Sequence, residues 1–289
     1  RSPAVMKSVQ NALFVVGYFL RRAHWLSLDV VLGAMLMHAV AYRLPDGRGQ
    51  SSWASTLLVG MAVFVIYTLD RFLDNRKTQT PATARHRFYH QQRDLLLKVV
   101  IGLAVVGFVL LFWLPFKVIV FGLIISLLSG LYLWVIFRSD AQHTAQLWKE
   151  PIVAIIYTLG VWMPSILVAE PVTWESYALM FLFGLVAFQN LLLFSWMESF
   201  DLDEGYSLAI AWGTEAVAKI ISILAVVVSV AGIVMAVSTT HHYASRAALT
   251  LAMMSFLTYL VKHHAPQLLP QERYRWLGDG VFLLAVWLW

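Results

Sequence analysis

The sequence predicts an all-α integral membrane protein whose helices form one polytopic bundle. Of its 289 residues, 60% are hydrophobic and only 13% are charged, and the mean hydropathy is +0.72. Soluble domains carry roughly a quarter charged residues, so this chain has too few polar groups to cover a water-facing surface. Because about 20 apolar residues are needed to cross a hydrocarbon core of ~30 Å, the chain has room for about nine spans.

Apolar runs separated by short polar connections define these spans. They are expected at Leu28–Leu44, Trp53–Leu73, Leu95–Leu114, Phe116–Phe137, Trp148–Ala169, Tyr177–Trp196, Thr214–Val237, Ala247–Val261 and Trp276–Trp289. The connections are too short for a second folded unit, so residues 26–289 are expected to form a single transmembrane domain.

The first residues, 1–25, differ from the spans that follow. They hold an apolar stretch that ends in Arg21, Arg22 and His24, and they lack the small-residue cleavage site of a signal peptide. An apolar stretch bordered by cations predicts an interfacial amphipathic segment that lies on the membrane.

Charge supports a membrane orientation over a nucleic-acid partner. The formal net charge is +5, but the basic residues lie between apolar runs and form no polar face, so nucleic-acid binding is not expected. If the N-terminus is cytoplasmic and the spans alternate, all Lys and Arg except Arg43, Arg48, Lys117 and Arg246 fall on the cytoplasmic side. That bias obeys the positive-inside rule, and a bacterial inner membrane is the expected location.

Acidic residues also gather at the cytoplasmic ends, although carboxylates do not follow the positive-inside rule. In the first cluster, after the second span, Asp70 and Asp74 are four residues apart. On a helix they share one face, where two carboxylates can bind a hard cation. A juxtamembrane salt-bridge network with Arg71, Arg76 and Lys77 is the alternative, and this spacing alone favours that network.

A second acidic cluster follows the sixth span and contains Glu198, Asp201 and Asp203. It lies about four spans after the first, in the matching position of the other half of the chain, like a weak internal repeat. Helices from the two halves can present their carboxylates to one cavity. The pair of clusters therefore favours a shared Mg²⁺ and phosphate site.

With these clusters the chain resembles the UbiA superfamily of intramembrane prenyltransferases, which are nine-helix bundles with Asp-rich motifs after the second and sixth helices. Asp70 and Asp74 match the last two acids of the first motif, Asn-Asp-x-x-Asp-x-x-x-Asp, while Ile66 and Tyr67 stand where its Asn and first Asp would be. Lys77, Thr78 and Arg85 are similar to the basic tail of that motif. The second cluster approximates the second motif with altered spacing.

The resemblance implies an enzyme that moves an isoprenyl group from a prenyl diphosphate to a lipophilic, aromatic acceptor, with Mg²⁺ assisting the departure of the diphosphate. The implied catalytic and metal-binding residues are Asp70, Asp74, Glu198, Asp201 and Asp203, and the implied diphosphate-binding residues are Arg71, Lys77, Arg85, Arg87 and Lys149. Tyr67, Tyr157, Asn190 and Phe194 are expected to line the substrate pocket. Helix packing is the alternative role for the aromatic residues, and snorkelling to the headgroups is the alternative for Lys149.

Two other functions stay open on sequence grounds. A UbiA-type terpene cyclase would ionise the same substrate but let the cation close on its own double bonds. A transporter or a non-catalytic membrane subunit would explain why the motifs depart from the family pattern. We also expect the ends of the second and sixth spans to converge, and the segment from Lys77 to Arg93 to fold over them as a lid.

Overall fold

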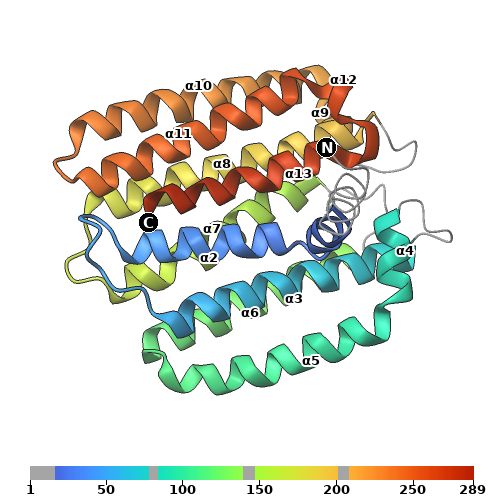
Figure 1. The fold of residues 1–289 in the computed structure, drawn as a ribbon, viewed down its shortest axis with the longest axis horizontal. Coiled ribbons are helices and arrows are strands. Elements are labelled where there is room, and N and C mark those ends of the chain that lie inside the picture. Colours follow the sequence, from blue (N-terminus) through green and yellow to red (C-terminus); the bar gives the residue numbers. More distant parts are fainter. Residues whose placement is uncertain (1–16, 78–83, 139–146, 201–207) are drawn as a thin grey trace, which may run out of the picture.

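The computed structural model describes residues 17–77, 84–138, 147–200 and 208–289, apart from the side chains of residues 74–77, 84–86 and 271. This part of the chain is helical throughout, with no strand, which confirms the all-α class (Figure 1). The long helices are α2 (Leu28–Tyr42), α3 (Trp53–Lys77), α5 (Arg93–Leu110), α6 (Phe116–Arg138), α7 (Lys149–Val168), α8 (Trp174–Glu198), α10 (Thr214–Ser238) and α11 (His242–His263). Shorter elements are α4 (Ala84–Gln91), η1 (Leu111–Trp113), α9 (Leu208–Trp212), α12 (Ala265–Leu268), η3 (Pro270–Glu272), α13 (Arg273–Gly280) and η4 (Val281–Leu288).

Seven of the described helices are long and apolar enough to cross a membrane, namely α3, α5 with η1, α6, α7, α8, α10 and α11. An eighth span results if α2 is joined to the preceding helix, Gly17–Trp25, from which it is bent by 71°. These are the helices of a multi-pass membrane protein, but the expected count of nine spans is not confirmed.

The two expected spans outside the seven are shorter than a bilayer requires. The 15 residues of α2 cover about 22 Å at ~1.5 Å per residue. The last expected span, Trp276–Trp289, consists of the end of α13 followed by the 3₁₀ helix η4. At ~1.5 Å and ~2.0 Å per residue, α13 and η4 together reach about 28 Å, just short of a ~30 Å core.

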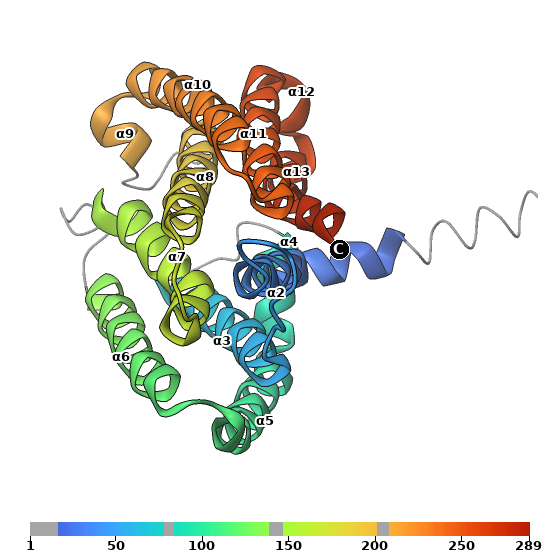
Figure 2. The same cartoon turned by 90° about the vertical axis from the view of Figure 1, so that its left-hand side faces the viewer.

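Successive long helices run in opposite directions, so their ends collect at two opposite ends of the bundle (Figure 1). At the end on the right of Figure 1, α3, α8 and α11 finish and α7, α10 and α13 begin. In Figure 2, α5 and α6 form the outer edge of the molecule, and α3 and α7 separate them from the other helices. α5 packs on α3 and α6 packs on α7, whereas α5 and α6 hardly touch each other.

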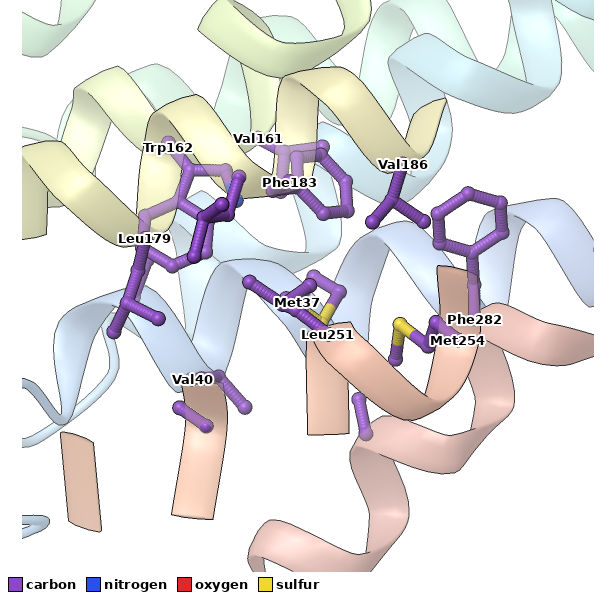
Figure 3. Close-up of a cluster of buried hydrophobic side chains, with 14 of the residues drawn as sticks. Met37, Val40, Val161, Trp162, Leu179, Phe183, Val186, Leu251, Met254 and Phe282 are labelled. Atoms are coloured by element: carbon purple, nitrogen blue, oxygen red, sulfur yellow. The ribbon is translucent and has the colours of Figure 1, made fainter. Parts of the chain in front are cut away.

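A large apolar core joins α2, α7, α8, α11 and η4 (Figure 3). Trp162 of α7 and Phe183 of α8 are fully buried in it, and their ring centroids are 5.9 Å apart. Phe282 of η4 packs on Phe183 at 5.9 Å. η4 can approach α2 because residue 33 is glycine: a Cβ at Gly33 would lie 2.6 Å from the Cβ of Phe282.

The outer faces of the helices are apolar, as lipid contact requires. Large side chains such as Phe112 (78% exposed), Leu127 (74%) and Val237 (79%) point away from the bundle. In water such surface would be unfavourable by about 25 cal/mol per Å², so this surface belongs against acyl chains.

Some polar side chains inside the bundle are paired across helices. Gln189 of α8 is fully buried, and its amide nitrogen donates to the carbonyl oxygens of Ile221 at 3.1 Å and Ser255 at 3.2 Å. The Ser255 hydroxyl donates back to Gln189 Oε1 at 2.5 Å. This clamp ties α8 to α10 and α11, and nothing in the sequence patterns singled it out.

The N-terminal segment is described from residue 17 onward. Its helix, Gly17–Trp25, carries exposed side chains at Tyr18, Phe19 and Leu20, consistent in composition with an interfacial segment. The bend before α2 occurs at Ser27, which adopts a left-handed conformation with φ of 55°. The membrane-surface role of residues 1–25 stays a prediction.

The helix α4 occupies part of the expected lid. Tyr89 of α4 is 1% exposed and packs edge-on against Phe72 of α3, with ring centroids 6.0 Å apart. Phe88 contacts Trp25 of the N-terminal helix at 5.5 Å. The described part of this segment is therefore packed on the bundle rather than projecting freely, and closure over the site stays a prediction.

Candidate functional site

Polar residues from five helical segments gather at the end of the bundle where α3 and α8 finish. The last turns of α3 supply Asp70 and Arg71, and the Asp70 carboxylate lies 3.9 Å from the Lys149 ammonium on α7. Both side chains are partly exposed, at 21% and 33% respectively. An exposed pair at this distance contributes little to stability, so both groups are suited to binding a charged ligand.

The first turn of α7 also reaches α8. Glu150, next to Lys149, interacts with the Ser195 hydroxyl of α8 and with the backbone of Leu208. Lys149 and Glu150 thus connect the end of α3 to the end of α8. This geometry places Asp70 and Glu198, the described members of the two acidic clusters, at the end of the bundle where α3 and α8 finish (Figure 1).

The end of α8 is tied to α13 by an arginine. Arg275, only 7% exposed, forms an ion pair with Glu198 and a second one with Glu272 at 3.5 Å. Its guanidinium lies over the Phe194 ring, 5.3 Å from the centroid. From the sequence, Arg275 is expected only to be one of the cytoplasmic cations, and its pairing with Glu198 was not predicted. Its position at the start of the last apolar run, two residues after Arg273, is the feature that could have indicated such a role.

A second polar group lies where the N-terminal helix, α2 and α13 meet. His24, Asp29 and Asp279 present ligand atoms that all lie within 4.8 Å of one another. The His24 Nδ1 is 2.5 Å from Asp29 Oδ2. We call this group the His24 triad. Asp279 was missed, although a lone carboxylate in an apolar run is unusual enough to mark a functional position.

An apolar cavity of about 400 Å³ lies among α3, α5, α6 and α7. Tyr67 and Tyr157, two of the four residues expected at the substrate pocket, are among those that line it, and its use by a substrate stays a prediction. The Tyr157 ring stacks on Phe183 with centroids 5.6 Å apart. Its hydroxyl is buried and has no hydrogen-bond partner among the described residues.

Tyr67 joins this cavity to the polar end. It lines the cavity, yet it also lies within electrostatic range of Asp70, Arg71, Asp29 and Asp279. Tyr67 therefore lies between the cavity and the charged groups, although Asp70, Arg71 and Lys149 are not among the residues that line the cavity.

Asn190 and Phe194, the other two residues expected in the substrate pocket, contact α13. Asn190 is 4% exposed, as expected of an amide in a span, but its Oδ1 lies against Gly278 of α13. Phe194 also contacts Gly278, where a Cβ would lie 2.6 Å from the Phe194 ring. Both residues belong to the α8–α13 interface and are not among the residues that line the 400 Å³ cavity.

Several predicted site residues lie outside the described part of the chain. These are Asp201 and Asp203, and the side chains of Asp74, Lys77 and Arg85. Arg87 is described and is exposed on α4. Of the expected Mg²⁺ ligands, only Asp70 and Glu198 have described side chains, and each has a cationic partner, Lys149 or Arg275. In the described residues, the groups spaced to hold a metal ion are those of the His24 triad.

Comparisons with protein-family models, with curated proteins and with solved structures each returned no match.

The described residues thus combine a polar end with an apolar cavity. The cations Lys149 and Arg71 lie at the polar end, and the cavity walls below Tyr67 are almost entirely hydrocarbon. Such a site can bind a charged group near the membrane surface while an apolar chain stays within the bundle.

Proposed function

We propose that the chain is a membrane prenyltransferase of UbiA type, which transfers an isoprenyl group from a prenyl diphosphate to a lipophilic, aromatic acceptor. The observation that carries the proposal is the position of Tyr67, between a 400 Å³ apolar cavity and a polar end that contains Asp70, Arg71 and Lys149. A prenyl diphosphate has the same division into an anionic head and an apolar tail. The proposal places the active site on the cytoplasmic face of a bacterial inner membrane.

The cationic side chains would hold the diphosphate. Arg71 and Lys149 donate charge-assisted hydrogen bonds to its oxygens, and Lys77, Arg85 and Arg87 are the further donors implied by the family resemblance. Mg²⁺, with Asp70, Asp74, Glu198, Asp201 and Asp203 as proposed ligands, would supply Lewis-acid stabilisation of the leaving pyrophosphate. Asp70 and Glu198 would have to exchange their present cationic partners for that ion.

The cavity would protect and stabilise the reacting carbon. When the allylic C–O bond breaks, its electron pair leaves with pyrophosphate and positive charge spreads over the allyl group. The faces of Tyr67 and Tyr157 stabilise such a cation, and the apolar walls exclude the water that would trap it. An electron pair from the acceptor then forms the new bond to the isoprenyl carbon, and the acceptor loses a proton.

The proposal is tested with the purified chain in lipid nanodiscs. Pyrophosphate release is measured over a panel of allylic diphosphates, with and without Mg²⁺ and with and without aromatic acceptors. We expect release that requires Mg²⁺ and a product whose mass equals the acceptor plus the isoprenyl group minus one proton.

Other outcomes identify other functions. Release with cyclic hydrocarbon products and no need of an acceptor would identify a terpene cyclase. No release from any diphosphate, with the protein folded, would reject both enzymatic functions and favour a transporter or a non-catalytic subunit.

A variant links the activity to the site. Asp70→Asn should slow pyrophosphate release, because it removes a proposed Mg²⁺ ligand. Asp46→Asn is its matched control and should keep the parental activity, because Asp46 is an exposed carboxylate in the turn that follows α2.

A further inference from the structure

The His24 triad brings together three metal-ligating side chains from three separate helical segments. His24 lies in the last turn of the N-terminal helix, Gly17–Trp25, and Asp29 lies in the first turn of α2. Asp279 lies near the end of α13 and is 250 residues away from Asp29 in the sequence. His24 is 8% exposed and the Asp29 side chain is 15% exposed. Asp29 and Asp279 are thus two half-buried carboxylates close to each other, which is unfavourable unless positive charge compensates them.

Neighbouring groups hold the triad in place. The His24 ring lies against the Trp276 ring at 4.6 Å, and the Val30 backbone N–H donates to Asp29 Oδ1 at 3.0 Å. The 71° bend between the two N-terminal helices points His24 back toward Asp29. Contacts of this kind orient metal ligands and are part of most metal sites.

The protein supplies part of the compensating charge. His24, Arg275 and Arg71 are the positive groups within electrostatic range of Asp279, and His24 has the largest effect of the three. Arg275 already pairs with Glu198 and Glu272. A divalent cation between Asp29 and Asp279 would balance both carboxylates directly.

One buried hydroxyl near the triad also has no protein partner. The Tyr157 hydroxyl is buried without a hydrogen-bond partner among the described residues, and Tyr157 lies within electrostatic range of Asp279. A buried polar atom of this kind calls for an explanation, for which a water or an ion is one candidate.

We infer that His24, Asp29 and Asp279 bind a divalent first-row transition metal, such as Mn²⁺, Fe²⁺ or Zn²⁺. Imidazole nitrogen together with carboxylate oxygen favours these ions over Mg²⁺, which prefers oxygen ligands alone. Three protein ligands leave coordination positions open for water or for an anionic ligand. The inference does not depend on the prenyl-transfer proposal, whose Mg²⁺ ligands are different residues.

The alternative is a metal-free ion pair in which His24 is protonated and holds Asp29 by the 2.5 Å contact. Ligands of one metal ion stand roughly 3 Å apart, so metal binding would displace this hydrogen bond and release a proton. The two states therefore differ in metal content, in proton release and in the response of stability to metal.

The test uses the full chain without an affinity tag, in nanodiscs, stripped with a chelator and titrated with Zn²⁺ and with Mn²⁺. Bound metal is measured by elemental analysis after dialysis. We expect one equivalent per chain, release of protons on binding, and at least about tenfold weaker affinity in His24→Gln and in Asp279→Asn. His263→Gln and Asp94→Asn are matched controls, because both positions are exposed and lie outside the triad; they should bind like the parent.

Thermal unfolding with and without metal separates a loss of metal binding from a general loss of stability, because each variant is compared with itself. Metal should raise the midpoint of the parent and the controls but not that of His24→Gln, since an ion that binds only the folded state stabilises it. The inference is overturned if the stripped parent takes up no equivalent of either metal, or if His24→Gln binds it as tightly as the parent. Asp74→Asn should leave this stoichiometry unchanged, so failure of the metal site and failure of the prenyl-transfer proposal give different results.

Discussion

The Lys149 ammonium lies 3.9 Å from the Asp70 carboxylate and joins the start of α7 to the end of α3. The pair is partly open to solvent, and it stands beside Tyr67 at the inner boundary of the polar end. Under the proposed function, the Lys149 ammonium would exchange its ion pair with Asp70 for one with the anionic head of the substrate. The two roles expected from the sequence, diphosphate binding and snorkelling to the headgroups, both stay predictions, because a partly exposed pair at this distance is compatible with either.

Replacement of Lys149 tests its role in binding diphosphate. Lys149→Gln should lower kcat/KM for the prenyl diphosphate by about tenfold to a hundredfold, the value of one charge-assisted hydrogen bond of ~1.5–3 kcal/mol. Lys98→Gln removes an exposed cation from the same end of the bundle and is the control. Equal activity of the two variants over a range of substrate concentrations would exclude Lys149 from the site.

Asp74 and Arg85 should differ in their effect on the Mg²⁺ requirement. Asp74→Asn keeps the shape but removes a negative ligand, and loss of ~3 kcal/mol of metal interaction slows turnover about a hundredfold. Arg85→Ala should weaken substrate binding while the Mg²⁺ dependence of pyrophosphate release stays as in the parent. If Asp74→Asn works at nearly the parental rate with unchanged Mg²⁺ dependence, Asp74 only balances nearby cations and the non-catalytic alternative gains support.

The ring of Tyr157 should matter more to turnover than its hydroxyl. Tyr157→Phe retains the aromatic face that lines the cavity, whereas Tyr157→Leu removes it and also the stacking on Phe183. We expect a severalfold to roughly thirtyfold lower rate for the leucine variant alone, from ~1–2 kcal/mol of cation–π stabilisation. Thermal midpoints of both variants separate this effect from lost packing. A phenylalanine variant as slow as the leucine variant would assign the role to the hydroxyl instead.

The Gln189 clamp predicts a stability effect that is independent of any activity. Gln189→Leu breaks the hydrogen bonds to Ile221 and Ser255, and the variant should unfold more easily by about 0.6 kcal/mol and by no more than ~1.7 kcal/mol. Thr250→Ala is the control, since it removes only a hydrogen bond within α11. Denaturation in mixed detergent measures both changes; a Gln189→Leu variant as stable as the control would show that the clamp adds no net stability.

The apolar spans could be predicted from the sequence because each long run of apolar residues forms its helix from local composition. The expected helices around α3, α7 and α8 were found close to their predicted bounds. The last apolar run did not become a regular α-helix: after Gly280 it continues as a 3₁₀ helix against α2. Its packing on α2 uses the close approach of Gly33 to Phe282, a tertiary contact that hydropathy does not encode.

The candidate site could likewise be predicted from the sequence only in part. Asp70, Lys149 and Glu198 could be assigned to one end of the bundle, because alternation of the spans determines which end each residue occupies. The partners Arg275 and Asp279 were missed, since their approach to Glu198 and Asp29 requires knowing that α13 returns along α2 and α8. Residue patterns identify which groups can ionise, but only packing shows which of them meet.

The weak packing between α5 and α6 has a consequence for how ligand affinity is measured. Both helices line the cavity, but each is held mainly by its inner neighbour, and η1 with the following turn connects them at one end. A ligand that arrives by this side comes from within the membrane, where its diffusion is two-dimensional and its concentration is a mole fraction of the lipid. Apparent affinities for lipophilic ligands should then change with the amount of lipid or detergent added at constant ligand, and comparisons between preparations require a fixed ratio of lipid to protein.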